Sequence, residues 1–303
     1  MQNKVETFFQ QMYQFTSLAR PIDPKTPSNL IAVLTASIVF IGAAILQLSD
    51  GEAVLASLSN AFLGAVTVFV AWVIAREIDP DHQGSSLWTL AIAIVIYALL
   101  GESALFSVVG LVIASRFLNR SVGPPPKIGD AIALIGIVGL AVGIHGHWVL
   151  GVLIFVALMF ENTLPMSDRK SYLYAIGVAL VTILAIYFTD NPVFDWTLDV
   201  PAIAIALLTG VAFVFYLLRQ PHHLQSSCDD GSRLIEWRRV FAAELLVLMA
   251  ALSLLIVEGA NGVAALGSAW AALGGVGWYA IYRYFSGQKE QQPSQNSAQQ
   301  AIN

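Results

Sequence analysis

Residues 29–48, NLIAVLTASIVFIGAAILQL, and residues 53–76, AVLASLSNAFLGAVTVFVAWVIAR, decide the fold class of this protein. Both segments are predominantly apolar, neither carries a charge before Arg76, and only the tetrapeptide SDGE separates them. About 20 such residues cross a hydrocarbon core of ~30 Å as a helix. The two segments therefore predict a hairpin of membrane-spanning helices.

The rest of the chain repeats this hairpin. The predicted class is an all-α, polytopic integral membrane helical bundle of about ten transmembrane helices arranged as five hairpins. The expected spans are 29–48, 53–76, 86–101, 103–118, 128–144, 147–161, 171–189, 200–218, 239–257 and 261–284. The four central segments are short, which leaves open whether they cross fully.

The composition agrees with a membrane protein. Hydrophobic residues make up 57% of the chain and charged residues 12%, against roughly 25% charged in an average soluble domain. We expect an amphipathic interfacial segment at 1–28, a transmembrane domain at 29–285 and a disordered polar tail at 286–303. Membrane lipids are the expected partners, and the net charge of −5 gives no indication of a nucleic-acid partner.

The basic residues predict the orientation. With these spans, all 15 Lys and Arg residues fall on alternate connections, from Lys4 to Lys289, and none falls on the others. Cytoplasmic loops collect Lys and Arg. Both termini are therefore expected in the cytoplasm, with the protein in the cytoplasmic (inner or plasma) membrane.

An acidic cluster follows the second span. Arg76, Glu77, Asp79 and Asp81 lie together, and Pro80 favours an extended backbone in which alternate carboxylates share a face. Such carboxylates could hold Mg²⁺ beside a phosphate. The alternative is a helix stop with capping acids and a favourable C-terminal cation.

A basic cluster follows the fourth span. Arg116 and Arg120 are one helical turn apart, so on a continuous helix they would share a face and could clamp a phosphate. The alternative is an ordinary anchor for anionic lipid. We predict that Arg76, Glu77, Asp79 and Asp81 lie near Arg116 and Arg120 and form one binding site at the cytoplasmic face. No catalytic residue is identified.

Glu244 joins this list because it is the acid expected deepest in the hydrocarbon. Ionisable groups there are costly and are functional candidates by default. The alternative is an ion pair with Arg238, Arg239 or Arg120. His145 and His147 on an outer turn could bind a transition metal, but a third ligand is not evident. We therefore expect no metal and no cofactor, except that an enzyme acting on a phosphorylated lipid could use Mg²⁺.

The function remains open between three classes. The arrangement of ten spans with both termini inside resembles that of drug/metabolite transporters, and the resemblance is limited to this arrangement. The leading interpretation is therefore transport of a small solute or lipid-related molecule. The alternative is a membrane-embedded enzyme acting at the cytoplasmic face on a phosphorylated or diphosphate lipid. The third is a non-catalytic scaffold, suggested by small-residue faces such as Gly267, Ala271 and Gly275. Transport predicts a path that reaches the outer face, whereas the enzyme predicts a cavity open only inside.

Overall fold

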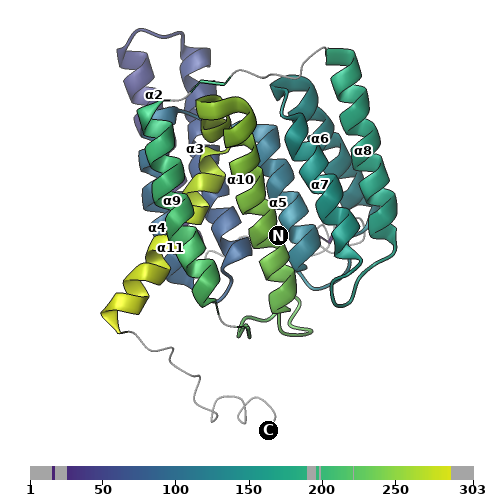
Figure 1. Cartoon of the computed structure of the whole chain (residues 1–303). Coiled ribbons are helices and arrows are strands. Elements are labelled where there is room, and N and C mark those ends of the chain that lie inside the picture. The colour runs from purple at the N-terminus through teal and green to yellow at the C-terminus, as the bar shows by residue number, and fades with distance from the viewer. Residues whose placement is uncertain (1–15, 18–25, 190–195, 198, 221, 288–303) are drawn as a thin grey trace, which may run out of the picture.

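The computed structural model describes residues 16–17, 26–189, 196–197, 199–220 and 222–287. This part of the chain is all-α and forms ten helices that run alternately up and down the bundle (Figure 1). They are α2 (Pro27–Ser49), α3 (Val54–Ile78), α4 (Gln83–Leu100), α5 (Leu105–Asn119), α6 (Ile128–His145), α7 (Trp148–Glu161), α8 (Lys170–Thr189), α9 (Val200–Arg219), α10 (Trp237–Ala265) and α11 (Gly267–Ser286).

The chain is a multi-pass membrane protein by the length and composition of these helices. Seven of them, α2, α3, α4, α6, α8, α9 and α10, are long and apolar enough to cross a membrane. The helices α5 and α7 are apolar but have only 15 and 14 residues. At ~1.5 Å per residue they reach little more than 20 Å, short of a ~30 Å core.

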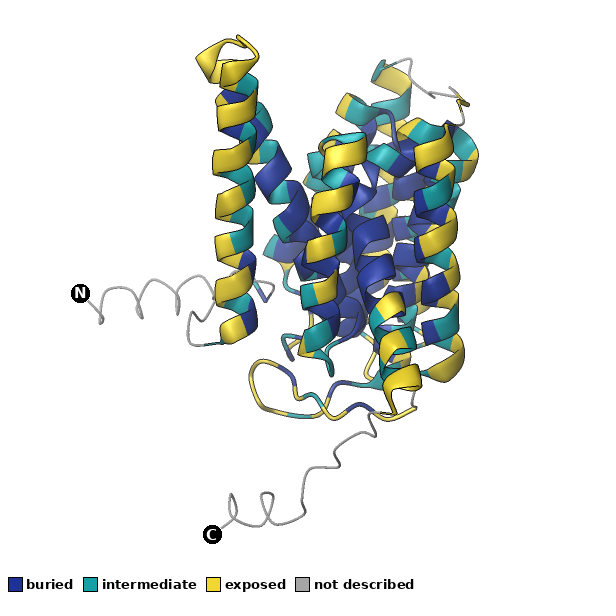
Figure 2. Ribbon diagram, turned by 90° about the vertical axis from the view of Figure 1, so that its left-hand side faces the viewer, coloured by how far each residue is buried: buried dark blue, intermediate teal, exposed yellow. Residues whose placement is uncertain are grey.

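Burial explains how the short helix α5 is accommodated. Figure 2 shows exposed residues along the peripheral helices and buried residues in the middle of the bundle. On α8, Leu173 and Ile183 are exposed apolar side chains, as expected for contact with lipid. On α5, Leu111 and Phe117 are buried. Since neighbouring helices cover α5, its backbone does not have to match the lipid thickness.

The last helix is inserted between two others through small residues. Gly267 and Gly275 lie against α4, close to Ile96 and Thr89, and Ala271 between them is fully buried. On another side of α11, Gly277 lies against the backbone of α9 at Ala212. The small-residue face thus brings α11 into close contact with α4, as its spacing predicts.

The turn expected at residues 258–261 is present as a reversal of the chain at Gly259 (φ 58°, ψ −130°), inside the range of α10. The residues after Gly259 fold back on those before it, since a Cβ atom at Gly262 would lie 2.2 Å from the Leu254 carbonyl oxygen. Only glycine adopts the backbone conformation of Gly259 readily. Ala260 N donates to Thr197 O at 2.6 Å, which holds the turn against the segment before α9. The short helical segment after the turn ends at Ala265, and α11 begins at Gly267.

The expected N-terminal interfacial segment and polar tail lie mostly outside the described residues. Residues 16–17 and 26–28 of the N-terminal segment are described, and Thr16 and Ser17 both contact Asp130 in the first turn of α6. Ser17 donates to the Asp130 carboxylate from its amide at 2.9 Å and from its hydroxyl at 2.6 Å. Asp130 therefore joins the N-terminal region to the bundle.

Candidate functional site

Glu77 and Arg116 form the centre of the predicted cluster. Glu77 lies in the last turn of α3 and is buried, and Arg116 lies in the last turn of α5. The Arg116 Nε atom donates to Glu77 Oε1 at 2.8 Å. The other carboxylate oxygen accepts from Asn119 Nδ2 at 2.8 Å and Ser121 Oγ at 2.7 Å. These contacts provide the ion pair and hydrogen bonds that a buried carboxylate requires.

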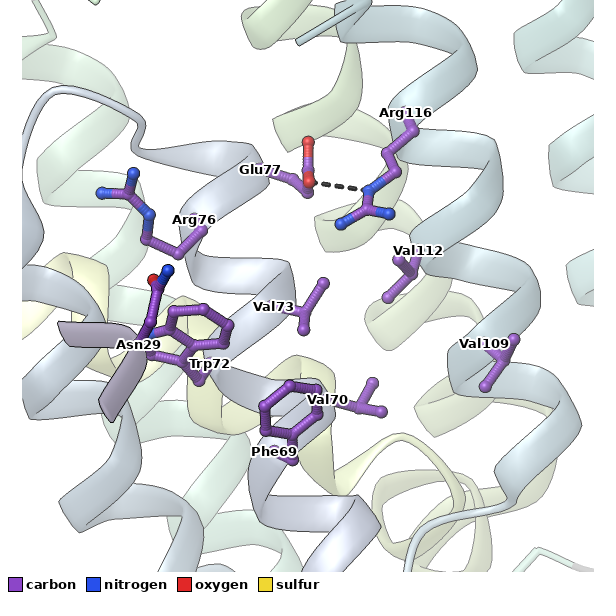
Figure 3. Close-up of a pocket in the computed structure, with 10 residues that line it drawn as sticks. All are labelled: Asn29, Phe69, Val70, Trp72, Val73, Arg76, Glu77, Val109, Val112 and Arg116. Atoms are coloured by element: carbon purple, nitrogen blue, oxygen red, sulfur yellow. Dashed lines mark hydrogen bonds and ion pairs between the residues drawn. The ribbon is translucent and has the colours of Figure 1, made fainter. Parts of the chain in front are cut away.

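A cavity of about 260 Å³ opens beside this ion pair. Figure 3 shows the Arg116 guanidinium and the Glu77 carboxylate at one end of the cavity and aromatic and valine side chains along the rest. The cavity lies among α2, α3 and α5 and is lined by Asn29, Phe69, Val70, Trp72, Val73, Arg76, Glu77, Val109, Val112 and Arg116. It suits a molecule with an apolar body and a polar group.

Arg120 does not share a helical face with Arg116, contrary to the sequence interpretation. The helix α5 ends at Asn119, and Arg120 adopts a left-handed backbone conformation with φ 50°. Its side chain turns away from Glu77 to Glu161 Oε1, at 2.7 Å, and to the carbonyl of Met166. The expected two-arginine clamp is therefore not formed by consecutive turns of one helix.

Glu161 instead organises a second buried cluster. The Arg239 guanidinium, which is fully buried, reaches the same Oε1 atom at 2.9 Å. Glu161 Oε2 accepts from Ser171 Oγ at 2.8 Å and from the amide of Asp168 at 3.3 Å. Two guanidinium groups on one carboxylate tie α5, α7, α8 and α10 together. We interpret this cluster as structural, because both of its guanidinium groups are paired with the same buried carboxylate, although Arg120 Nε has no partner among the described residues.

Asp79 and Asp81 take partners different from those of Glu77. Asp79 Oδ1 lies 2.7 Å from His82 Nδ1, and His82 in turn contacts Arg283 on α11. Asp81 accepts from the amides of Gln225 and Ser226 at 3.0 and 2.8 Å. Asp81 thus anchors the loop between α9 and α10. The three carboxylates do not form the shared Mg²⁺-binding face considered from the sequence, and no group of three metal-ligating side chains occurs among the described residues.

A second recess, of about 460 Å³, lies at the opposite end of the same helices. Its walls are Leu63, Glu102, Ser103, Ala104, Leu105, Phe106, His145, His147, Asn261, Ala264 and Ala265. The rings of His145 and His147 are stacked, with their centroids 5.6 Å apart. His147 Nε2 lies 3.2 Å from Glu258 Oε2, and His147 Nδ1 lies 2.7 Å from Ser107 Oγ. Ser107 and Glu258 were not predicted as site residues from the sequence. Glu258 could have been predicted, because it is an acidic residue next to Gly259 in a connection without Lys or Arg.

The two recesses lie along the same two helices, α3 and α5, and have no lining residue in common. On α5, Leu105 and Phe106 line the opposite-end recess, while Val109, Val112 and Arg116 line the cavity beside Glu77. Residues 105, 109, 112 and 116 are spaced by three or four, so they follow one face of the helix. The recesses are thus successive parts of one seam between α3 and α5.

A polar contact lies along α3 between the two recesses. Ser103 N donates to Thr67 Oγ1 at 2.9 Å, and Ser268 Oγ donates to Thr67 O at 2.8 Å. Thr67 lies between Leu63 and Phe69 on α3, the residues that belong to the two recesses. This contact joins α3, the α4–α5 connection and α11 at a level of α3 between the lining residues of the two recesses.

The chain matches no protein-family model, no curated protein and no solved structure in the three comparisons made. The functional argument therefore rests on the geometry of the recesses and of the buried charges.

Proposed function

We propose that the protein is a membrane transporter whose substrate path follows the seam between α3 and α5. The observation that carries the proposal is that the same faces of these two helices line a recess at each end of the bundle. Val109 is three positions after Phe106, a distance of ~5 Å along a helix. A small relative movement of α3 and α5 would therefore suffice to close one recess and open the other, as alternating access requires.

The walls suggest the class of substrate. The cavity beside Glu77 is mainly apolar, is smaller than the roughly 300–1,000 Å³ of typical ligand pockets, and has guanidinium groups at one end. These features favour a small solute with an apolar body and an acidic group. A phosphorylated lipid would meet the same chemistry at this end, but an enzyme that acts only there would have no need of the second recess.

The proposal includes the orientation predicted by the basic residues. The end of the bundle that contains Arg76, Arg116, Arg120 and Arg239 would face the cytoplasm, both termini would lie there, and all ten helices within residues 29–285 would belong to the transmembrane domain. A reporter active only in the cytoplasm should give signal when fused after Asn303. Signal from a reporter active only outside, fused at the same residue, would contradict the orientation.

The path itself can be tested by labelling with a membrane-impermeant maleimide. In a chain with Cys228→Ser as its background, Val109→Cys should react with reagent added at either side of the membrane in turn, because Val109 lies on the shared face of α5. Ile183→Cys is the control, since Ile183 is exposed on the outside of α8, where lipid would exclude the reagent. Reaction of Val109→Cys from the cytoplasmic side alone would contradict transport and favour the enzyme.

A further inference from the structure

Glu244 is a fully buried carboxyl group whose hydrogen bonds come from neutral side chains. It lies on α10, and its Oε1 atom is 2.6 Å from Gln220 Nε2 and 3.3 Å from the Tyr216 hydroxyl, both from α9. Its Oε2 atom has no hydrogen-bond partner among the residues that the structure describes. A buried charge is costly unless it is paired, so this arrangement favours the protonated, neutral form of Glu244.

The cations that the sequence suggested as partners of Glu244 are engaged elsewhere. Arg239 binds Glu161, the Pro165 carbonyl at 2.7 Å and the Leu118 carbonyl at 2.8 Å. Arg120 also binds Glu161. Arg238 is exposed and lies over the Trp237 ring. The ion pair between Glu244 and one of these arginines, which the sequence suggested, is therefore not formed.

The charged groups on the α3 side make a second negative charge still less favourable. Asp79, which is buried at the end of α3, adds a negative charge on this side of Glu244. Asp79 is bonded to His82, and His82 to Arg283 of α11, so the basic groups on that side face Asp79. Asp81, further along the same connection, is bonded to the amides of Gln225 and Ser226.

Tyr216 connects Glu244 to the substrate seam. Its hydroxyl oxygen lies 3.3 Å from Glu244 Oε1 and 3.3 Å from the carbonyl oxygen of Ile78. A phenol has a single hydrogen to donate, so it can serve only one of these acceptors at a time. Ile78 is the last residue of α3 and directly follows Glu77, which belongs to the wall of the cavity.

We propose that Glu244 binds the proton whose uptake and release drive transport. This proposal rests on the proposed function. When a proton from water binds the carboxylate, the carboxyl group becomes neutral and Tyr216 is free to donate to the Ile78 carbonyl. When the proton leaves, Tyr216 donates to the carboxylate and its bond to α3 is lost. Binding of one proton is thereby linked to the end of the helix that lines both recesses.

The site can be tested on the purified full-length chain without knowledge of the substrate. Infrared difference spectra between acidic and alkaline pH should show the carbonyl band of a buried protonated carboxyl group, and Glu244→Gln should abolish that band. Glu52→Gln is the control, because Glu52 is exposed and lines neither recess, so its replacement should leave the band unchanged. Tyr216→Phe should keep the band in place but make it disappear only at a more alkaline pH, because the carboxylate formed on deprotonation loses its hydrogen bond from Tyr216. This variant remains informative if Glu244→Gln fails to fold.

Two results would overturn the proposal. The first is a band that persists in Glu244→Gln, or a band whose dependence on pH is unchanged in Tyr216→Phe. The second is stabilisation of the unsubstituted protein against heat by Na⁺, but not by acidification, with loss of that effect in Glu244→Gln, because the site would then bind sodium. Maleimide labelling from both sides together with either result would leave transport supported and the proton site refuted. Labelling from one side only, with the band assigned to Glu244, would do the reverse.

Discussion

Close packing of α11 against α4 makes Gly275 a sensitive position. A Cβ atom at residue 275 would lie 2.0 Å from Thr89 Oγ1 and 2.5 Å from both Thr89 N and Thr89 Cα. Favourable contacts between heavy atoms are found at about 3.5–4.0 Å. Two of the three atoms belong to the backbone of α4, so rotation of the Thr89 side chain cannot relieve the clash. Gly275→Ala therefore requires the two helices to separate by roughly 1 Å.

The size of the effect follows from two opposing contributions. Overpacking of a well-packed core destabilises typically by about 1–3 kcal/mol. Replacement of glycine by alanine within a helix contributes up to about 1 kcal/mol in the other direction. The net expectation for Gly275→Ala is a decrease of about 1–2 kcal/mol in the free energy of unfolding.

Gly136→Ala provides the matched control. Gly136 lies within α6, and a Cβ atom there would meet nothing within 4 Å. This variant gains the helix contribution without the clash, so it should be neutral or slightly more stable. The assay is unfolding by sodium dodecyl sulfate in mixed micelles, followed by near-ultraviolet circular dichroism. If the two variants unfold at the same denaturant fraction, α11 does not pack on α4 through Gly275, and the reasoning is refuted.

Two further predictions concern the buried charges and the single cysteine. Glu161→Gln should destabilise the protein by about 3–5 kcal/mol in the same assay, because it leaves Arg120 and Arg239 buried without their carboxylate; an unchanged midpoint relative to Glu102→Gln would contradict this role. Burial raises the pKa of the Cys228 thiol and outweighs the opposite effect of the nearby Arg233 cation, so less thiolate is present at neutral pH than in a free cysteine. Alkylation of Cys228 by iodoacetamide should therefore be slower than that of a model thiol at neutral pH and should increase as the pH rises; equal rates at neutral pH would show that the thiol is not shielded.

The candidate site was partly predictable from the sequence. Proximity of Glu77 to Arg116 follows from two helices that end on the same side of the bundle, each with a charged residue in its last turn. The partners of Arg120 and Asp81 could not be found in this way. The left-handed backbone conformation of Arg120, just after the end of α5, directs its own side chain to Glu161. Asp81 binds backbone amides of a loop 144 residues away in the chain. Backbone reversals and loop contacts leave no periodic pattern in the sequence.

The sequence by itself determined the class of this protein and the approximate place of each helix, because hydrophobic segments of sufficient length must satisfy their backbone hydrogen bonds internally when they enter lipid. Only the tertiary structure decided which charges meet, where the recesses lie and how Glu244 is surrounded. Those features depend on helix rotation and on contacts between residues far apart in the chain. Many alternative arrangements of the same apolar segments would satisfy the lipid equally well, and the choice among them is made by close packing, as at Gly275, and by the pairing of buried charges, as at Glu161.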